Sequence, residues 1–212
     1  MNSGDKVTSC LLKWFEKYRR SFLWRNKHIS LYKLLACEAF LWKTQAETVS
    51  DFLPEFFNKY PSPIKIKNRS LKLLSKDIKR LGLSNRRAKL LKQISFSFGD
   101  AQDIPKSENE FRKQFKVGQY IARSILTIRY GLPLFPVDQN VYRFFKRVFN
   151  HKIKNIRTIT PRDDIFLRRF IIKGKKDIVW AVIDFTSQIC KRNNPKCNSC
   201  FLTKYCHYCG IK

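Results

Sequence analysis

The chain has 212 residues, which suits one domain or two small lobes, and 43% of them are hydrophobic, enough for a packed core, so global disorder is excluded. Lys and Arg total 44 against 16 Asp and Glu, which gives a formal charge of +28. This excess indicates a polyanionic partner. Nucleic acid is favoured, because each cation placed at a phosphate releases condensed counterions, and an acidic membrane surface is the alternative. A transmembrane segment is excluded, since no apolar run approaches about 18 residues.

The pattern along the chain is helical, because Gly (7) and Pro (8) are sparse and apolar residues recur at spacings of three and four. Pro54 predicts a break or kink in the third helix. Ser84 and Ser107 are placed to cap the helices that follow them, Ser107 in a capping box with Glu110. The predicted helices cover residues 11–18, 31–42, 49–60, 71–81, 84–94, a short segment from 107, 120–130, 139–149, 161–173 and 175–189. The predicted fold class is therefore all-α, with an irregular cysteine-rich tail.

Five of the 7 cysteines lie in this tail, four of them in the spacing Cys190-x6-Cys197-x2-Cys200-x5-Cys206 and the fifth, Cys209, as a spare. The start of the chain lacks the basic and then apolar order of a signal peptide, so we expect a cytoplasmic protein (nucleoid-associated in a prokaryote). In that compartment cysteines are more often metal ligands or free thiols than disulfide partners. Four closely spaced thiolates can enclose a tetrahedral metal ion or a [4Fe–4S] cluster, and the spacing alone leaves both open.

The cysteine spacing resembles the iron–sulfur loop of the endonuclease III and MutY branch of the helix–hairpin–helix DNA glycosylases. The resemblance implies that the four cysteines hold a [4Fe–4S] cluster rather than zinc. It also implies that the loop after the first cysteine grips DNA phosphates, and the basic residues Lys191 and Arg192 suit that task.

The segment from Val117 to Ala122 is similar to the family hairpin Leu-Pro-Gly-Val-Gly-x-x-Thr-Ala, although Phe115 and Lys116 replace the Pro-Gly pair and Ile121 replaces Thr. A glycine-bearing turn into a helix offers bare N–H groups to a phosphate. An ordinary helix–turn–helix corner is the alternative. The candidate DNA-binding residues of the hairpin are Lys116, Val117, Gly118 and Gln119.

The segment Pro-Val-Asp-Gln-Asn-Val-Tyr-Arg, which ends at Arg143, is similar to the family element Val-Asp-x-Asn-Val-x-Arg that carries the catalytic aspartate, here Asp138. Asp138 also fits as the N-cap of the next helix, where the helix dipole and free N–H groups favour the carboxylate form. A fixed negative charge stabilises the cationic sugar of the transition state or orients water. We include Arg143 among the candidate DNA contacts.

Glu38 lies on the apolar stripe of its predicted helix, where burial favours the protonated form. Glu38 and Asp138 would then have pKa values pushed apart, as an acid and a base require, while a boundary glutamate paired with lysine is the alternative. The segment that begins at Glu38 resembles Glu-Val-Met-Leu-Gln-Gln-Thr-Gln of the adenine-mismatch branch. This implies that Glu38 handles the departing base and that Trp42, Lys43 and Gln45 enter the DNA stack, with a core position as the alternative for Trp42.

Two further segments resemble the mismatch-repair members: Phe-Leu-Trp-Arg, ending at Arg25, and the stretch from Ile78 to Ala88, which looks most like the archaeal thymine/uracil mismatch glycosylases. Bifunctional members carry a lysine where this chain has Tyr120. The resemblance therefore implies a monofunctional enzyme that uses water, with Tyr120 facing the base, although Lys113 or Lys116 leaves weak lyase activity open.

These observations predict two all-α lobes: a helical barrel domain with the hairpin (22–132) and an iron–sulfur cluster domain (1–21 plus 133–212). The expected partner is double-stranded DNA with a mispaired or modified base that is flipped into the site, and the protein is expected to be a monomer without membrane attachment. The favoured reaction is hydrolysis of the N-glycosidic bond of uracil or thymine opposite guanine, by Asp138, Glu38 and Tyr120. The alternatives are a glycosylase for another lesion or hypermodified base, and an iron–sulfur DNA-binding protein without catalysis.

Overall fold

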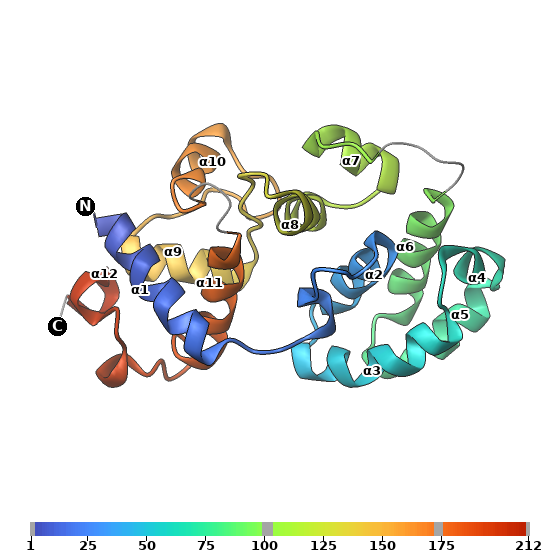
Figure 1. The fold of residues 1–212 in the computed structure, drawn as a ribbon, viewed down its shortest axis with the longest axis horizontal. Coiled ribbons are helices and arrows are strands. Elements are labelled where there is room, and N and C mark those ends of the chain that lie inside the picture. Colours follow the sequence, from blue (N-terminus) through green and yellow to red (C-terminus); the bar gives the residue numbers. More distant parts are fainter. Residues whose placement is uncertain (1–2, 99–103, 172–175, 211–212) are drawn as a thin grey trace. The chain divides into compact units, whose positions relative to one another are not determined.

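The computed structural model describes residues 3–98, 104–171 and 176–210 (Figure 1). Helices and their connecting loops account for these residues, with no β-strand among them, which confirms the predicted all-α class. Within the same ranges, no helix combines the length and the apolar character that a bilayer span requires. The chain divides into two compact units, which we call the central unit (Ser21–Ile125) and the terminal unit (Met1–Arg20 with Leu126–Lys212).

The core of the central unit is built around α2 (Leu31–Leu41), most of whose side chains are buried. Phe40 of α2 packs edge-to-face on Phe52 and Phe56 of α3 (Ala46–Lys59), with ring centroids 5.4 and 4.8 Å apart. The predicted break at Pro54 does not occur, because the proline lies on the exposed side of α3 and the buried side stays continuous. The other elements of the unit are η1 (Leu23–Arg25), α4 (Pro63–Asn68), α5 (Leu71–Asp77), η2 (Lys79–Leu81), α6 (Ser84–Phe96), α7 (Glu108–Phe115) and the first half of α8 (Gln119–Tyr130).

Two predicted caps in the central unit differ from the structure. Ser84 is the first residue of α6 rather than its cap, because Gly82 and Leu83 both have positive φ and the chain enters the helix from a left-handed rather than an extended residue. Ser107 does stand at the N-cap of α7, but its side chain makes no capping hydrogen bond. The capping box predicted with Glu110 is therefore wrong.

The terminal unit packs α1 (Ser3–Tyr18), α9 (Gln139–Phe149) and α11 (Asp177–Gln188) around one aromatic-rich core. Asp184, fully buried on α11, accepts hydrogen bonds from the Arg20 main-chain nitrogen at 3.0 Å and from its Nε at 2.7 Å, and so fixes the chain that leaves α1. The remaining elements are α10 (Pro161–Arg168), η3 (Cys197–Ser199), η4 (Thr203–Tyr205) and α12 (His207–Gly210). α10 is shorter than the predicted segment 161–173, which extends into residues outside the described ranges.

Candidate active site

Glu38 lies inside the central unit, with 4% of its surface exposed, which agrees with its predicted place on the apolar stripe of α2. Its Oε1 accepts a hydrogen bond from the hydroxyl of Ser124 at 2.6 Å. Ser124 is also buried and comes from α8, so the carboxyl group is held between two helices far apart in sequence. The Glu38 carboxyl is therefore shielded from water and held in one orientation, unlike a carboxylate on the protein surface.

Tyr120 lies in the first turn of α8 and is half-buried. It precedes Ser124 by four residues, so the two side chains occupy the same face of the helix, one turn apart. The central unit therefore brings Glu38 and the Tyr120 face of α8 together through Ser124. The sequence reasoning missed Ser124, although a polar residue one turn after Tyr120 within an apolar helix was the available signal.

The hairpin joins α7 to α8 through Lys116, Val117 and Gly118. Lys116 adopts the left-handed conformation, with φ of 51°, which costs about 1–3 kcal/mol for a residue other than glycine. The two helices are tied together by Glu108, which accepts hydrogen bonds from Gln119 Nε2 at 2.7 Å and Arg123 Nε at 2.8 Å. Val117 is buried, while Lys116 and Gly118 are exposed, so the turn offers its backbone and one cation to the outside.

The loop between α2 and α3 carries the predicted DNA-stacking residues Trp42, Lys43 and Gln45, and all three are exposed. Trp42 is 37% exposed, which argues against a core position, and the Arg86 guanidinium lies 4.3 Å from its ring centroid. Lys43 has φ of 58°, a second lysine in the left-handed region.

Arg87 of α6 holds this loop from behind. Its guanidinium is buried and donates to the main-chain oxygens of Phe40 at 3.0 Å, Trp42 at 2.6 Å and Gly82 at 2.9 Å. It also donates to the Leu81 carbonyl and the Thr44 hydroxyl. Burial lowers the pKa of Arg87, yet the guanidinium stays charged at neutral pH, so these oxygens compensate a buried cation.

Asp138 is the N-cap of α9, as predicted, and its Oδ1 accepts a hydrogen bond from the Val141 main-chain nitrogen at 2.8 Å. Burial raises the pKa of Asp138, and this outweighs the opposing effect of the hydrogen bonds from Val141 and Asn140. The hydrogen bonds at the helix terminus favour the carboxylate, as expected, but they do not set the direction of the net pKa shift. The reason is that desolvation of the charged form has the larger effect here.

A chain of side-chain hydrogen bonds runs from Asp138 to the cysteine-rich tail. Asn140 donates to Asp138 Oδ2 at 3.1 Å, and Arg143 donates to Asn140 Oδ1 at 3.0 Å and to the Cys190 carbonyl at 2.9 Å. A further bond joins Arg143 to the Thr186 carbonyl at 3.0 Å. The Arg143 guanidinium, predicted to contact DNA, therefore binds groups of the protein itself. Its hydrogen bonds link the start of the tail to the N-terminal end of α9, where Asp138 lies.

Arg147, one turn after Arg143 on α9, holds the loop that follows Cys190. It donates to the carbonyls of Lys191 at 2.7 Å and Arg192 at 3.1 Å, and to Cys190 Sγ at 3.5 Å. With their carbonyls held, Lys191 and Arg192 remain exposed. Sequence reasoning missed Arg147, whose spacing of four from Arg143 was the only signal.

The tail brings its cysteines to one place. The small cavity beside α9 is lined by Cys190, Cys197, Cys200, Cys206 and Cys209 together with Arg147 and Tyr208. In the described part of the chain, no group of three or more His, Cys, Asp or Glu side chains is arranged to hold a metal ion. The side chains around this cavity nevertheless suit an iron–sulfur cluster chemically, because the four cysteines would supply thiolate ligands. The Arg147 guanidinium also donates a hydrogen bond to Cys190 Sγ.

Comparison with known proteins agrees with this geometry. The model of the HhH-GPD superfamily of base excision DNA repair proteins matches residues 41–163. The thymine/uracil-DNA glycosylase of Pyrobaculum aerophilum is 28% identical over 92% of this chain and 87% of its own length, and the thymine-DNA glycosylase of Aeropyrum pernix is 30% identical over 93% and 92%. The solved structure of a thermostable thymine-DNA glycosylase superimposes with a TM-score of 0.87 at 27% identity and covers 99% of this chain and 98% of that one.

The family match includes the α2–α3 loop, the hairpin and Asp138, and it confirms the resemblance that the sequence motifs predicted. The match covers more than half of the chain, and relatives align along almost all of it. The chain therefore belongs to the HhH-GPD superfamily of base excision DNA repair proteins.

Proposed function

We propose that this DNA glycosylase is monofunctional and excises thymine or uracil mispaired with guanine from double-stranded DNA. The observation that carries the proposal is the buried Glu38 carboxyl, hydrogen-bonded by Ser124 one helical turn from Tyr120. The similar proteins named above, which are glycosylases for thymine or for thymine and uracil, support the choice of base. Tyr120 in place of a hairpin lysine supports a water nucleophile.

In this mechanism the ionised Asp138 stabilises the positive charge that develops on the sugar as the glycosidic bond breaks, or orients the attacking water. Glu38, held by Ser124, faces the departing base together with Tyr120. Both pyrimidines leave as an anion unless a proton or hydrogen bond reaches them, so a buried carboxyl is suited to this task.

DNA is held by three loops in this proposal. The hairpin amides at Gly118 and Gln119 and the Lys116 side chain hold a phosphate, Trp42 and its neighbours in the α2–α3 loop enter the gap left by the flipped nucleotide, and the loop after Cys190 adds cations. Arg143 is left out of the DNA contacts because its guanidinium binds protein carbonyls. The expected species on DNA is a monomer.

The four cysteines at 190, 197, 200 and 206 would hold a [4Fe–4S] cluster. When bound, the cluster would be held by bonds between its irons and the four cysteine thiolates, and these bonds would fix the loop carrying Lys191 and Arg192. In the structure the loop is already anchored by Arg147, so protein contacts and cluster would act on the same segment.

The test is base release from a panel of duplexes containing thymine, uracil, adenine opposite oxidised guanine, and further modified bases, with and without alkali. We expect release of thymine and uracil opposite guanine, with strand breaks appearing only after alkali treatment. Asp138→Asn keeps an N-cap side chain but removes the charge, so it should lose about 100-fold or more in rate while still binding DNA. Asp164→Asn, a carboxylate on α10 bonded to Arg168, is the matched control. Release of another base without release of thymine or uracil would contradict the proposed substrate and would identify that other base as the substrate.

A further inference from the structure

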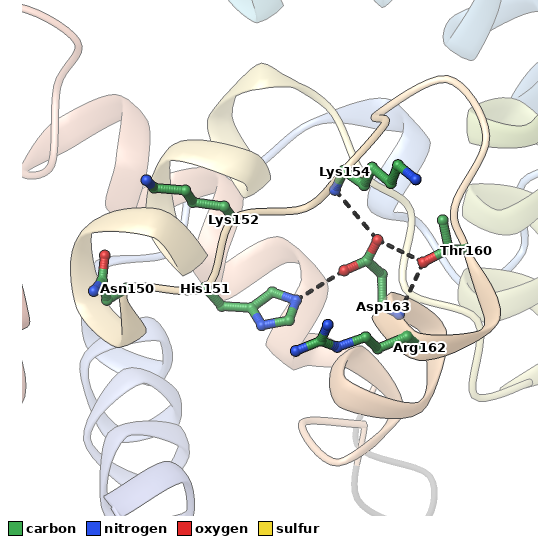
Figure 2. Close-up of a pocket in the computed structure, with 7 residues that line it drawn as sticks. All are labelled: Asn150, His151, Lys152, Lys154, Thr160, Arg162 and Asp163. Carbon is green, nitrogen blue, oxygen red and sulfur yellow. Dashed lines mark hydrogen bonds and ion pairs between the residues drawn. The ribbon is translucent and has the colours of Figure 1, made fainter.

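A cavity of about 420 Å³ opens in the terminal unit between the loop that follows α9 and the start of α10. Figure 2 shows its lining, in which one side is formed by the loop residues 150–154 and the other by the first turn of α10. Asn150 closes α9 in the left-handed conformation, with φ of 51°, and directs the chain into this loop. None of the active-site residues discussed above lines this cavity.

The rim of the cavity is cationic. Lys152, Lys154 and Arg162 are exposed, and no ion pair engages any of these three side chains in the described part of the chain. Figure 2 shows the two lysines extending from the loop and Arg162 reaching from α10 toward the ring of His151. Three exposed cations around one hollow, none of them in an ion pair with the described residues, favour a negatively charged ligand there.

The single carboxylate of the cavity is committed to the protein. Asp163 is buried, and its Oδ1 lies 3.0 Å from His151 Nε2, while Oδ2 accepts hydrogen bonds from Thr160 Oγ1 at 2.7 Å and the Lys154 main-chain nitrogen at 3.3 Å. Burial alone would raise the pKa of Asp163, but these hydrogen bonds outweigh it and lower the pKa. Asp163 thus fixes the floor of the cavity rather than neutralising its rim.

His151 is held in one orientation by two contacts. Its ring stacks on Phe166 with 3.8 Å between ring centroids and an interplanar angle of 6°, and its Nε2 faces Asp163. The other ring nitrogen, Nδ1, is therefore presented in a fixed direction, where it can hydrogen-bond a ligand. A fixed ring, an arginine and two lysines form a polar set that suits an oxyanion.

From this arrangement we propose that the cavity is a binding site for a phosphate group, held by Lys154 and Arg162 and seated against the His151–Asp163 pair. The phosphate has two sources, the backbone of DNA or a free phosphate-bearing molecule. Asp138 caps the opposite end of α9, and a helix of 11 residues spans about 16 Å, so a duplex at Asp138 has phosphates at that distance. The DNA source rests on the proposed glycosylase function, whereas the free-ligand source does not.

The first measurement is an NMR titration of the full-length protein with inorganic phosphate at constant ionic strength, read at the amides of residues 150–163 and the His151 ring. Shifts should centre on these residues, and the double variant Lys154→Ala/Arg162→Ala should bind phosphate about tenfold or more weakly. The control Lys6→Ala/Lys13→Ala removes the same charge from exposed positions on α1 and should behave as wild type. Thermal melts show whether each variant is folded.

The second measurement is the salt dependence of binding to a mismatch duplex. If DNA supplies the phosphate, the slope of log K against log salt becomes shallower in the double variant by about 0.9 for each phosphate that the variant no longer neutralises, beyond any change in the control. Phosphate shifts without this change identify a free ligand, and the change in slope identifies DNA. A protein that shows neither overturns the proposal. Base release by the wild type, measured on the same duplex, tests the glycosylase function separately, because the phosphate titration needs no catalysis.

Discussion

The two units each hold a candidate DNA-contacting loop with an arginine that donates to main-chain carbonyls, but they do so at different depths. In the central unit, Arg87 is buried and its guanidinium reaches five oxygens around the α2–α3 loop. In the terminal unit, Arg147 is half-buried and reaches two carbonyls and one sulfur of the tail. One planar donor that makes several hydrogen bonds can thus give a fixed shape to a loop without regular structure. We expect the more deeply buried arginine to contribute more to the stability of its loop.

The largest effect is expected from Arg87→Met. It removes the donor while leaving several carbonyls without partners, and each buried unsatisfied group costs about 1–3 kcal/mol, so the free energy of unfolding should fall by about 3 kcal/mol or more. Arg87→Lys should recover little, because one ammonium cannot span the same acceptors. Denaturant unfolding measures this, with Arg86→Met as the control from the neighbouring exposed position. A loss below about 1 kcal/mol in Arg87→Met would show that the loop keeps its shape without the guanidinium.

Arg147→Met should have a smaller effect, about 1–2 kcal/mol on unfolding, because water reaches the carbonyls that it leaves. Its second expected effect is a lower iron content of the purified protein, since the same arginine positions the loop of the first cysteine. Lys146→Met removes an exposed charge from the same helix and serves as control. Equal destabilisation by Arg147→Met and Arg87→Met would contradict the proposed dependence on depth.

The Asp138 carboxyl group of the terminal unit leads to a prediction on pH. Burial raises the pKa of Asp138, and the proposed mechanism uses the ionised form, so base release should decline on the acid side at a higher pH than the value near 4 of an ordinary aspartate. Below that point the rate should fall about tenfold per pH unit. Single-turnover base release across pH, with DNA affinity measured at each point, separates this from weakened binding. An acid limb at or below pH 4 would show that bound DNA reverses the effect of burial.

Sequence patterns predicted the helical class, most of the helices, the buried Glu38 and the capping role of Asp138, because periodicity and local spacing determine these features. They did not identify Arg147 or Ser124, and they placed Arg87 in the family-like stretch from Ile78 to Ala88 without giving it a role. Each of these acts across a distance in sequence, Arg87 over 43 residues to Thr44 and Ser124 over 86 to Glu38, and a polar residue on an apolar face does not reveal its partner. The direction of the Asp138 pKa shift was also beyond the sequence, since the depth of burial depends on the packed structure.

The hairpin is the third candidate DNA-contacting loop. A substitution at Gly118 shows whether the glycine is needed for folding or for binding DNA. A Cβ at Gly118 would meet nothing within 4 Å, so Gly118→Ala should change the free energy of unfolding by less than about 0.5 kcal/mol. DNA affinity should nevertheless fall several-fold, because the added methyl group would stand where a phosphate approaches the hairpin amides. Gly131→Ala is the opposite control, since its φ of 67° strains any other residue and should cost about 1 kcal/mol of stability without weakening DNA binding. Unchanged affinity in Gly118→Ala would mean that the phosphate is held by Lys116 alone, and the hairpin would then act through its charge rather than its backbone.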